Sequence, residues 1–286
     1  MTETTVHAVL EARFALDGGA MFGVVPKPLW TRTNPADDAN RIDLGTRCML
    51  IRHPVAGNIL VDVGIGQKWD EKGRRIYNIR HTDEGEGGAA LGLEAGLRAY
   101  GLGMDDIDHV ILTHLHFDHA GGLTVVRDGE LQPVFAGRPH YVMRQHWEWA
   151  NAPSERDAGS FRREDFGIFE DRPDLAPLTL LDGITELFDG VTLIPRYGHT
   201  PAMSCVLVDA GHDKYIYLAD LIPTAGHVRI PYVMGYDLDP RATCREKREI
   251  LSEAARHDWV LFFEHDPTRA TCRVEPDGRG QWRIAQ

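Results

Sequence analysis

The feature that most constrains this chain is a dense group of metal-capable side chains directly after an apolar strand. Within the segment 111–122 (ILTHLHFDHAGG), His114, His116, Asp118 and His119 occupy six consecutive positions with only two other residues between them. Imidazole and carboxylate groups are ligands that zinc, iron, manganese and cobalt all accept. Four such groups exceed what a packed core needs, so the segment predicts a metal site rather than a chance group of buried histidines.

The spacing of these residues indicates how the chain presents them. Residues i and i+2 at an extended strand end share a face, so His114 and His116 can both point at one ion. Asp118 and His119 follow on the turn, where the chain has changed direction and a second ion can be reached. The spacing therefore favours a site with two ions.

Three later points of the chain show an apolar strand that runs straight into another metal-capable side chain. These are 191–195 before His199, 214–219 before Asp220, and 259–264 before His265. A single histidine or aspartate after a strand is more often a loop residue. Three of them downstream of the dense group are much stronger evidence, because strands that end at one sheet edge gather distant residues into one site.

The rest of the chain is typical of one continuous domain over residues 1–286. An apolar content of 43% is enough for a sizeable core, and no linker or repeat divides the sequence. Strand-like segments alternate with helical ones, yet several strands are consecutive, which favours two sheets flanked by helices. The clearest helix begins at Asp239-Pro240 and runs to about His257. The predicted class is therefore α/β or α+β, in layers.

Charge and apolar patterning restrict the partners and the location that we expect. Acidic residues outnumber lysine plus arginine by 43 to 31, which disfavours a nucleic-acid substrate. No apolar run approaches the roughly 20 residues needed to cross a bilayer, and the N-terminus has no signal-peptide pattern. We therefore expect no membrane partner and a cytoplasmic location. The four cysteines are widely spaced, so they are expected to be reduced structural thiols.

Several motifs resemble those of the metallo-β-lactamase superfamily. The run HLHFDH resembles its HxHxDH signature, and Gly198-His199-Thr200-Pro201 resembles its GHTPG loop, with Ala202 in place of the final glycine. The run NILVDVG resembles the early strand and turn of the family, whose aspartate, here Asp62, normally supports the metal ligands. A plain turn residue is the alternative interpretation of Asp62.

The resemblance implies a four-layer αββα sandwich and two divalent metal ions. It places the first ion on His114, His116 and His199, the second on Asp118, His119 and His265, and Asp220 between them. Zinc is the default ion, although manganese, cobalt and iron accept the same ligands. A metal-bridging hydroxide would then be the nucleophile. Asp118 or Asp220 is the candidate proton shuttle, and a pure ligand role for Asp220 is equally open.

The stretches 219–237 and 262–266 resemble the branch that contains YtnP-type quorum-quenching lactonases, which are related to N-acyl homoserine lactonases and to methyl parathion hydrolase. The leading expectation is a lactonase that opens N-acyl homoserine lactones or related small lactones. The alternative is an organophosphate or aryl-ester hydrolase on the same metal centre. An iron-dependent oxidoreductase of the sulfur dioxygenase type is a third reading.

The substrate pocket is less constrained by the sequence. The best-known homoserine lactonases carry a tyrosine three residues after the bridging aspartate, where this chain has Pro223. His227, Tyr232 and Tyr236 are candidates to replace that phenol, and a structural role is the alternative for each. The aromatic segment 146–169, with Trp147 and Phe166, could line an acyl-chain pocket or pack inward. The resemblance also implies a homodimer, for which Phe14, Met21, Phe22 and Trp30 are candidate contacts.

Overall fold

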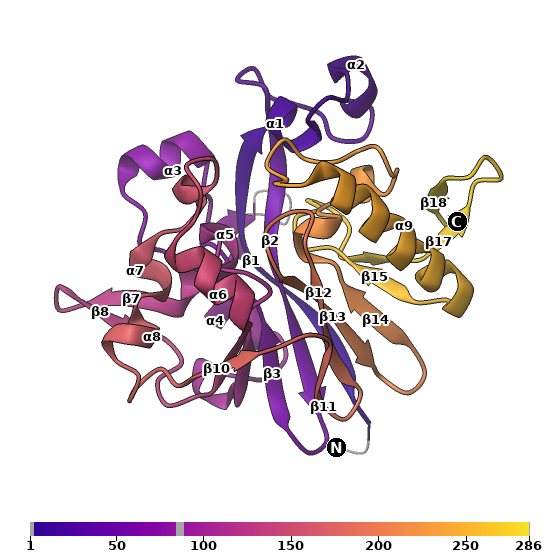
Figure 1. Cartoon of the computed structure of the whole chain (residues 1–286). Helices are drawn as coiled ribbons and strands as arrows, with labels where there is room; N and C mark the ends of the chain where they lie inside the picture. The colour runs from indigo at the N-terminus through magenta and orange to yellow at the C-terminus, as the bar shows by residue number, and fades with distance from the viewer. Residues whose placement is uncertain (1–2, 84–88, 286) are drawn as a thin grey trace. The chain divides into compact units, whose positions relative to one another are not determined.

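The computed structural model describes residues 3–83 and 89–285. The chain forms two compact units, each built from two stretches: Met1–Phe14 with Thr46–Gly183 is unit 1, and Ala15–Gly45 with Ile184–Gln286 is unit 2. The division falls within β1 (Thr5–Asp17) and β2 (Arg41–His53), the first long strands of the chain (Figure 1). The prediction of one domain over 1–286 therefore stays a prediction, and each unit is described by itself.

Unit 1 is built on a six-stranded sheet with the order β1-β2-β3-β6-β9-β10. After β1 and β2, its strands are β3 (Gly57–Val61), β6 (His109–Ile111), β9 (His140–Met143) and, at the edge, β10 (Leu178–Leu181). β3, β6, β9 and β10 run parallel, and Val61 is in register with Ile111. Because parallel strands end at the same sheet edge, Asp62 and the histidine segment after Ile111 leave the sheet side by side.

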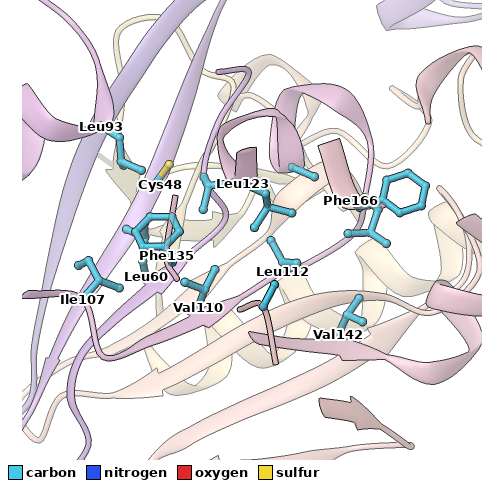
Figure 2. Close-up of a cluster of buried hydrophobic side chains, with 14 of the residues drawn as sticks. Cys48, Leu60, Leu93, Ile107, Val110, Leu112, Leu123, Phe135, Val142 and Phe166 are labelled. Atoms are coloured by element: carbon cyan, nitrogen blue, oxygen red, sulfur yellow. The ribbon is translucent and has the colours of Figure 1, made fainter. Parts of the chain in front are cut away.

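Buried apolar side chains hold unit 1 together. Val110 and Leu112 lie in one hydrophobic cluster with Cys48 and Leu60 of the neighbouring strands, and all four are completely buried (Figure 2). Burial of such apolar surface is the main force that stabilises a unit of this size. The remaining elements of unit 1 are α3 (Glu71–Tyr77), β4 (Thr82–Asp83), β5 (Ala89–Ala90), α4 (Leu93–Arg98), η2 (Met104–Asp106), α5 (Phe117–Ala120), η3 (Gly121–Leu123), β7 (Thr124–Arg127), β8 (Glu130–Pro133), α6 (Arg144–Asn151), η4 (Ala158–Ser160), α7 (Arg163–Phe166) and α8 (Ile168–Asp171).

Unit 2 contains the second six-stranded sheet, with the order β11-β12-β13-β14-β15-β16. The strands are β11 (Thr185–Phe188), β12 (Val191–Arg196), β13 (Met203–Asp209), β14 (Lys214–Tyr217), β15 (Val260–Phe262) and β16 (Thr271–Cys272). β14 and β15 are parallel, with Tyr217 opposite Phe262. Asp220 lies three residues after the end of β14, and His265 lies three residues after the end of β15. Both therefore lie at the same edge of the sheet. The other elements of unit 2 are α1 (Gly18–Phe22), α2 (Lys27–Trp30), η5 (Ala219–Leu221), η6 (Ala225–His227), α9 (Pro240–His257), β17 (Val274–Pro276) and β18 (Trp282–Ile284).

Helix α9 confirms the helix predicted from Asp239-Pro240. The Asp239 side chain accepts hydrogen bonds from the backbone N–H groups of Arg241 and Ala242, both at 3.0 Å, and Pro240 takes the first helical position. The helix ends at His257, and the next residue, Asp258, caps it with a left-handed backbone conformation at φ 55°. Local capping chemistry therefore sets both ends of this helix.

Lys247 is a completely buried cation on α9. Its Nζ donates to the carbonyl oxygens of His227, Arg229 and Tyr232 at 2.6, 2.8 and 2.7 Å. Burial lowers the pKa of Lys247 to about 7. An ammonium group has three protons to donate, and the three carbonyl oxygens accept one each. Lys247 thus fixes the loop that follows Asp220.

A buried ion pair ties two loops of unit 1 together. Lys68 Nζ lies 2.9 Å from Asp165 Oδ1, and it also donates to the carbonyl oxygens of Gly121 and Thr124 at 2.5 and 3.0 Å. Burial lowers the pKa of Lys68 and raises the pKa of Asp165, and each charge opposes that shift in its partner. The pair therefore anchors α7 to the chain directly after the histidine segment.

Breaking this pair from one side should cost more than removing both charges. Lys68→Met is expected to lower the free energy of unfolding by about 3–5 kcal/mol, because Asp165 would be left as a buried charge without its partner. The double variant Lys68→Met/Asp165→Leu should lose clearly less than the sum of the single variants, as measured by urea unfolding. The exposed pair of Arg144 and Asp182 is the control, with a coupling of at most about 1 kcal/mol. Equal coupling in both pairs would contradict the role of Lys68.

Candidate metal centre

The dense histidine segment forms the first group of candidate ligands, here called the unit 1 cluster: His114, His116, Asp118 and His119. His114 Nε2 lies 3.1 Å from His116 Nδ1, and the rings of His114 and His119 have centroids 3.8 Å apart. All four residues are buried, with at most 7% of their surface exposed. The strand end and the short helix α5 thus gather these groups as their spacing suggested.

Asp62 orients one ring of the unit 1 cluster. It has a left-handed backbone with φ 57°, and its carboxylate accepts from Thr113 N, Thr113 Oγ1 and His119 Nδ1 at 2.8, 2.7 and 3.0 Å. Since a carboxylate only accepts, the proton of His119 lies on Nδ1, and Nε2 is left to face Asp118 at 3.9 Å. A histidine held in this way by an outer carboxylate is typical of metal ligands. Asp62 is thus both a turn residue and a support for His119.

His146 also supports the unit 1 cluster, although no sequence pattern marks it as a site residue. Its Nε2 accepts a hydrogen bond from the backbone N–H of Leu115 at 2.8 Å, and its side chain is completely buried. This contact holds the turn between His114 and His116. The sequence signal was only a histidine at the start of the aromatic segment 146–169, which does not reveal a partner 31 positions away.

The second group of candidate ligands, the unit 2 cluster, consists of His199, Asp220 and His265. The two oxygens of Asp220 lie 3.1 Å from His199 Nε2 and 3.0 Å from His265 Nε2. All three side chains are buried. A single carboxylate therefore lies between two imidazoles that come from distant parts of the chain.

The outer nitrogens of both imidazoles in the unit 2 cluster are held as well. His199 Nδ1 lies 3.0 Å from Asp237 Oδ1, and His265 Nδ1 donates to the carbonyl oxygen of Gly45 at 2.8 Å. Burial lowers the pKa of His199, but Asp220 and Asp237 outweigh it and raise that pKa to about 10. Burial also raises the pKa of Asp220, yet the two histidines hold it well below its usual range.

Both clusters fit the binding of divalent ions. Each offers buried imidazole and carboxylate groups, and the outer nitrogens of His119, His199 and His265 are engaged so that Nε2 points to the neighbouring carboxylate. Burying so many polar groups together costs free energy unless a bound ion or another polar group pairs with them. The His and Asp groups therefore suggest divalent metal ions.

Ala202 shows how the chain accommodates its departure from the glycine of the family motif. It has a left-handed backbone with φ 54° and is buried. An alanine there costs on the order of 1–2 kcal/mol relative to an ordinary conformation. The loop after His199 thus keeps a turn that glycine would adopt without strain.

The structure favours a structural role for His227 and Tyr232. His227 Nε2 donates to the carbonyl oxygen of Met21 at 2.8 Å, and Nδ1 lies 2.8 Å from Thr224 Oγ1. Burial lowers its pKa to about 3, so the ring stays neutral. The His227 ring stacks on Phe22 at 4.1 Å, and Tyr232 meets the same ring edge-on at 6.1 Å.

The candidate dimer contacts from the N-terminal region are also interior residues. Phe22 stacks on Trp30 at 5.4 Å within unit 2, and Phe14, Met21, Phe22 and Trp30 are at most 1% exposed. Side chains packed in this way offer no surface to a second copy, so the prediction that these four residues are dimer contacts is wrong. A dimer through another surface stays a prediction.

Trp147 and Phe166 pack inside unit 1. The Trp147 ring lies 6.0 Å from the rings of both Phe166 and Phe169, within the hydrophobic core. These contacts favour inward packing over an acyl-chain pocket for this pair. Phe161 of the same segment differs, because its ring lies 4.7 Å from that of His116.

A family model described as the metallo-beta-lactamase superfamily matches residues 41–265. The chain belongs to this superfamily. The predicted metallo-β-lactamase fold is thereby confirmed, and so is the prediction of a metal-dependent hydrolase. Among the residues that the structure describes, no helix is long and apolar enough to span a membrane.

Individual relatives agree with this membership. A probable metallo-hydrolase of Mycobacterium tuberculosis is 26% identical over 275 residues, which cover 90% of this chain and 85% of the relative. An N-acyl homoserine lactonase of Rhizobium radiobacter is 28% identical over 178 residues, or 60% of this chain and 62% of the relative. The crystal structure of a probable metal-dependent hydrolase from Staphylococcus aureus superposes with a TM-score of 0.86 at 28% identity, covering 99% of this chain and 98% of that one.

Asp62 provides a test of how the unit 1 cluster is supported. Asp62→Asn keeps the shape of the side chain and tolerates the left-handed backbone, but it removes the charge that holds His119. The affinity for zinc is expected to fall about 10–100-fold, measured by competition with a chromophoric chelator. The exposed Asp182→Asn is the control and should bind zinc as the wild type does. Unchanged affinity in Asp62→Asn would show that Asp62 is only a turn residue.

Proposed function

We propose that the unit 1 and unit 2 clusters together hold two divalent ions, by default zinc, in a lactonase of N-acyl homoserine lactones or related small lactones. The observation that carries the proposal is the Asp220 carboxylate between His199 Nε2 and His265 Nε2, with both outer ring nitrogens engaged. In this proposal His114, His116 and His199 hold one ion, Asp118, His119 and His265 hold the other, and Asp220 is shared.

Bound ions would supply the Lewis acidity that turns water into a nucleophile near neutral pH. The protein must then provide a proton for the ring oxygen that leaves when the lactone opens. Asp220 is poorly suited to that task, because each of its carboxylate oxygens faces an imidazole of the unit 2 cluster and the proposal shares this carboxylate between the ions. We therefore assign Asp118 as the proton shuttle and Asp220 as a ligand.

The lactone substrate is supported by the lactonase named among the relatives. It is also supported by the clusters, whose candidate ligands are all imidazole or carboxylate groups. The alternative on the same centre is an organophosphate or aryl-ester hydrolase. Phe161, with its ring 4.7 Å from that of His116, suits an aryl group as well as an acyl chain. An oxidoreductase of the sulfur dioxygenase type would in addition require redox-active iron.

A substrate panel separates these activities. Zinc-loaded protein should open acyl homoserine lactones of graded chain length in a pH-drift assay, with a higher kcat/KM than for aryl phosphotriesters and thioesters. A chelator should abolish the activity and added zinc should restore it. Faster cleavage of phosphotriesters would establish the alternative, and oxygen uptake with a persulfide on iron-loaded protein would establish the oxidoreductase.

The ligand assignment has its own test. His116→Ala combined with His265→Ala removes one ligand from each cluster and should reduce both zinc content and kcat/KM to background. His212→Ala, at an exposed histidine of unit 2, is the matched control and should keep both. Hydrolysis that survives the double substitution would refute a metal mechanism for every substrate considered.

A further inference from the structure

Three aromatic rings pack against one another beside the unit 1 cluster. Trp69 meets Tyr77 and Phe117 edge-on, each with centroids 5.2 Å apart, and the Tyr77 and Phe117 rings lie 5.1 Å apart. Phe117 is the residue between His116 and Asp118, so the aromatic triad packs on the segment that carries these candidate metal ligands. All of these residues belong to unit 1.

Tyr77 differs from the other tyrosines of unit 1 in the use of its hydroxyl group. The hydroxyl of Tyr100 donates to the carbonyl oxygen of Ala8 at 2.9 Å, and that of Tyr141 lies 3.1 Å from His109 Nδ1. The Tyr77 hydroxyl makes no hydrogen bond to any residue within 3–83 or 89–285. Among the described residues, the hydroxyl of this half-buried phenol is thus available to donate to a bound molecule.

The charges around Tyr77 come from the metal-ligand side of the unit. Burial raises the pKa of Tyr77, the negative charge of Asp118 raises it further, and Arg162 acts in the opposite direction. The Arg162 guanidinium lies 3.9 Å from the centre of the Trp69 ring and forms an ion pair with Glu164. The Tyr77 hydroxyl is therefore a neutral, protonated donor within the electrostatic reach of Asp118.

We propose that Tyr77 donates a hydrogen bond to an ester-group oxygen of the bound substrate beside Asp118, while Trp69 and Phe117 hold the Tyr77 ring in place. This inference rests on the proposed hydrolase function of the same site. The histidine and tyrosine in the loop after Asp220 are less suitable donors, because both ring nitrogens of His227 are engaged and Tyr232 packs against Phe22.

Tyr77→Phe is the decisive variant, because it keeps the ring contacts and removes only the hydroxyl. On the best-cleaved substrate of the panel, kcat/KM is expected to fall about tenfold, the size of one hydrogen bond of about 1.4 kcal/mol. The affinity of zinc-loaded protein for N-hexanoyl homoserine, the ring-opened product, should fall by a similar factor in calorimetry. Zinc content and the thermal unfolding midpoint should stay at wild-type values.

Tyr141→Phe is the matched control, since it removes a unit 1 hydroxyl that is engaged with His109. Its kcat/KM and product affinity should remain within about twofold of the wild type. The inference on Tyr77 is overturned if Tyr77→Phe matches this control in both measurements. Wild-type protein that cleaves a phosphotriester but no lactone would instead overturn the proposed substrate, while the effect of Tyr77→Phe on the cleaved ester still decides the role of Tyr77.

Discussion

The hydrogen bond between an imidazole and an outer acceptor is the interaction on which both clusters depend. Asp62 holds His119, Asp237 holds His199, and the carbonyl oxygen of Gly45 holds His265, at distances of 2.8 to 3.0 Å. Each contact fixes the orientation of one ring and leaves its Nε2 facing a carboxylate. Without these outer acceptors, buried imidazoles would be free to turn, and their burial would be costly.

Strand geometry brings these contacts together within each unit. In unit 1 the parallel pairing of β3 with β6 places Asp62 beside the start of the histidine segment. In unit 2 the parallel pairing of β14 with β15 carries Asp220 and His265 past the same sheet edge with equal offsets. Buried ammonium groups then fix the loops that follow, Lys68 in unit 1 and Lys247 in unit 2. Lys68 and Lys247 thus stabilise the fold and also hold the loops next to the candidate metal ligands in place.

Much of the fold and of the candidate site could be predicted where the signal is local. The four ligands of the unit 1 cluster, the capped helix at Asp239-Pro240 and the apolar strands before His199, Asp220 and His265 are all visible in short windows of sequence. The candidate pocket residues were harder to predict. Trp147 and Phe166 pack into the core, His227 lies under Phe22, and Phe161 is the aromatic residue that contacts His116. No periodicity in the segment 146–169 distinguishes these roles.

The sequence by itself determined the chemistry of the ligands, their strand-end spacing and the superfamily, because neighbours at i and i+2 are set by backbone geometry. Only the tertiary structure decided which distant group forms a hydrogen bond with the outer nitrogen of each imidazole. Asp62 lies 57 positions from His119, and Gly45 lies 220 positions from His265. It also decided that, among the described residues, the hydroxyls of Tyr100 and Tyr141 have a hydrogen-bond partner and that of Tyr77 has none. The physical reason is that the partner of a buried polar group depends on which loops pack over it, and no short stretch of sequence specifies that packing.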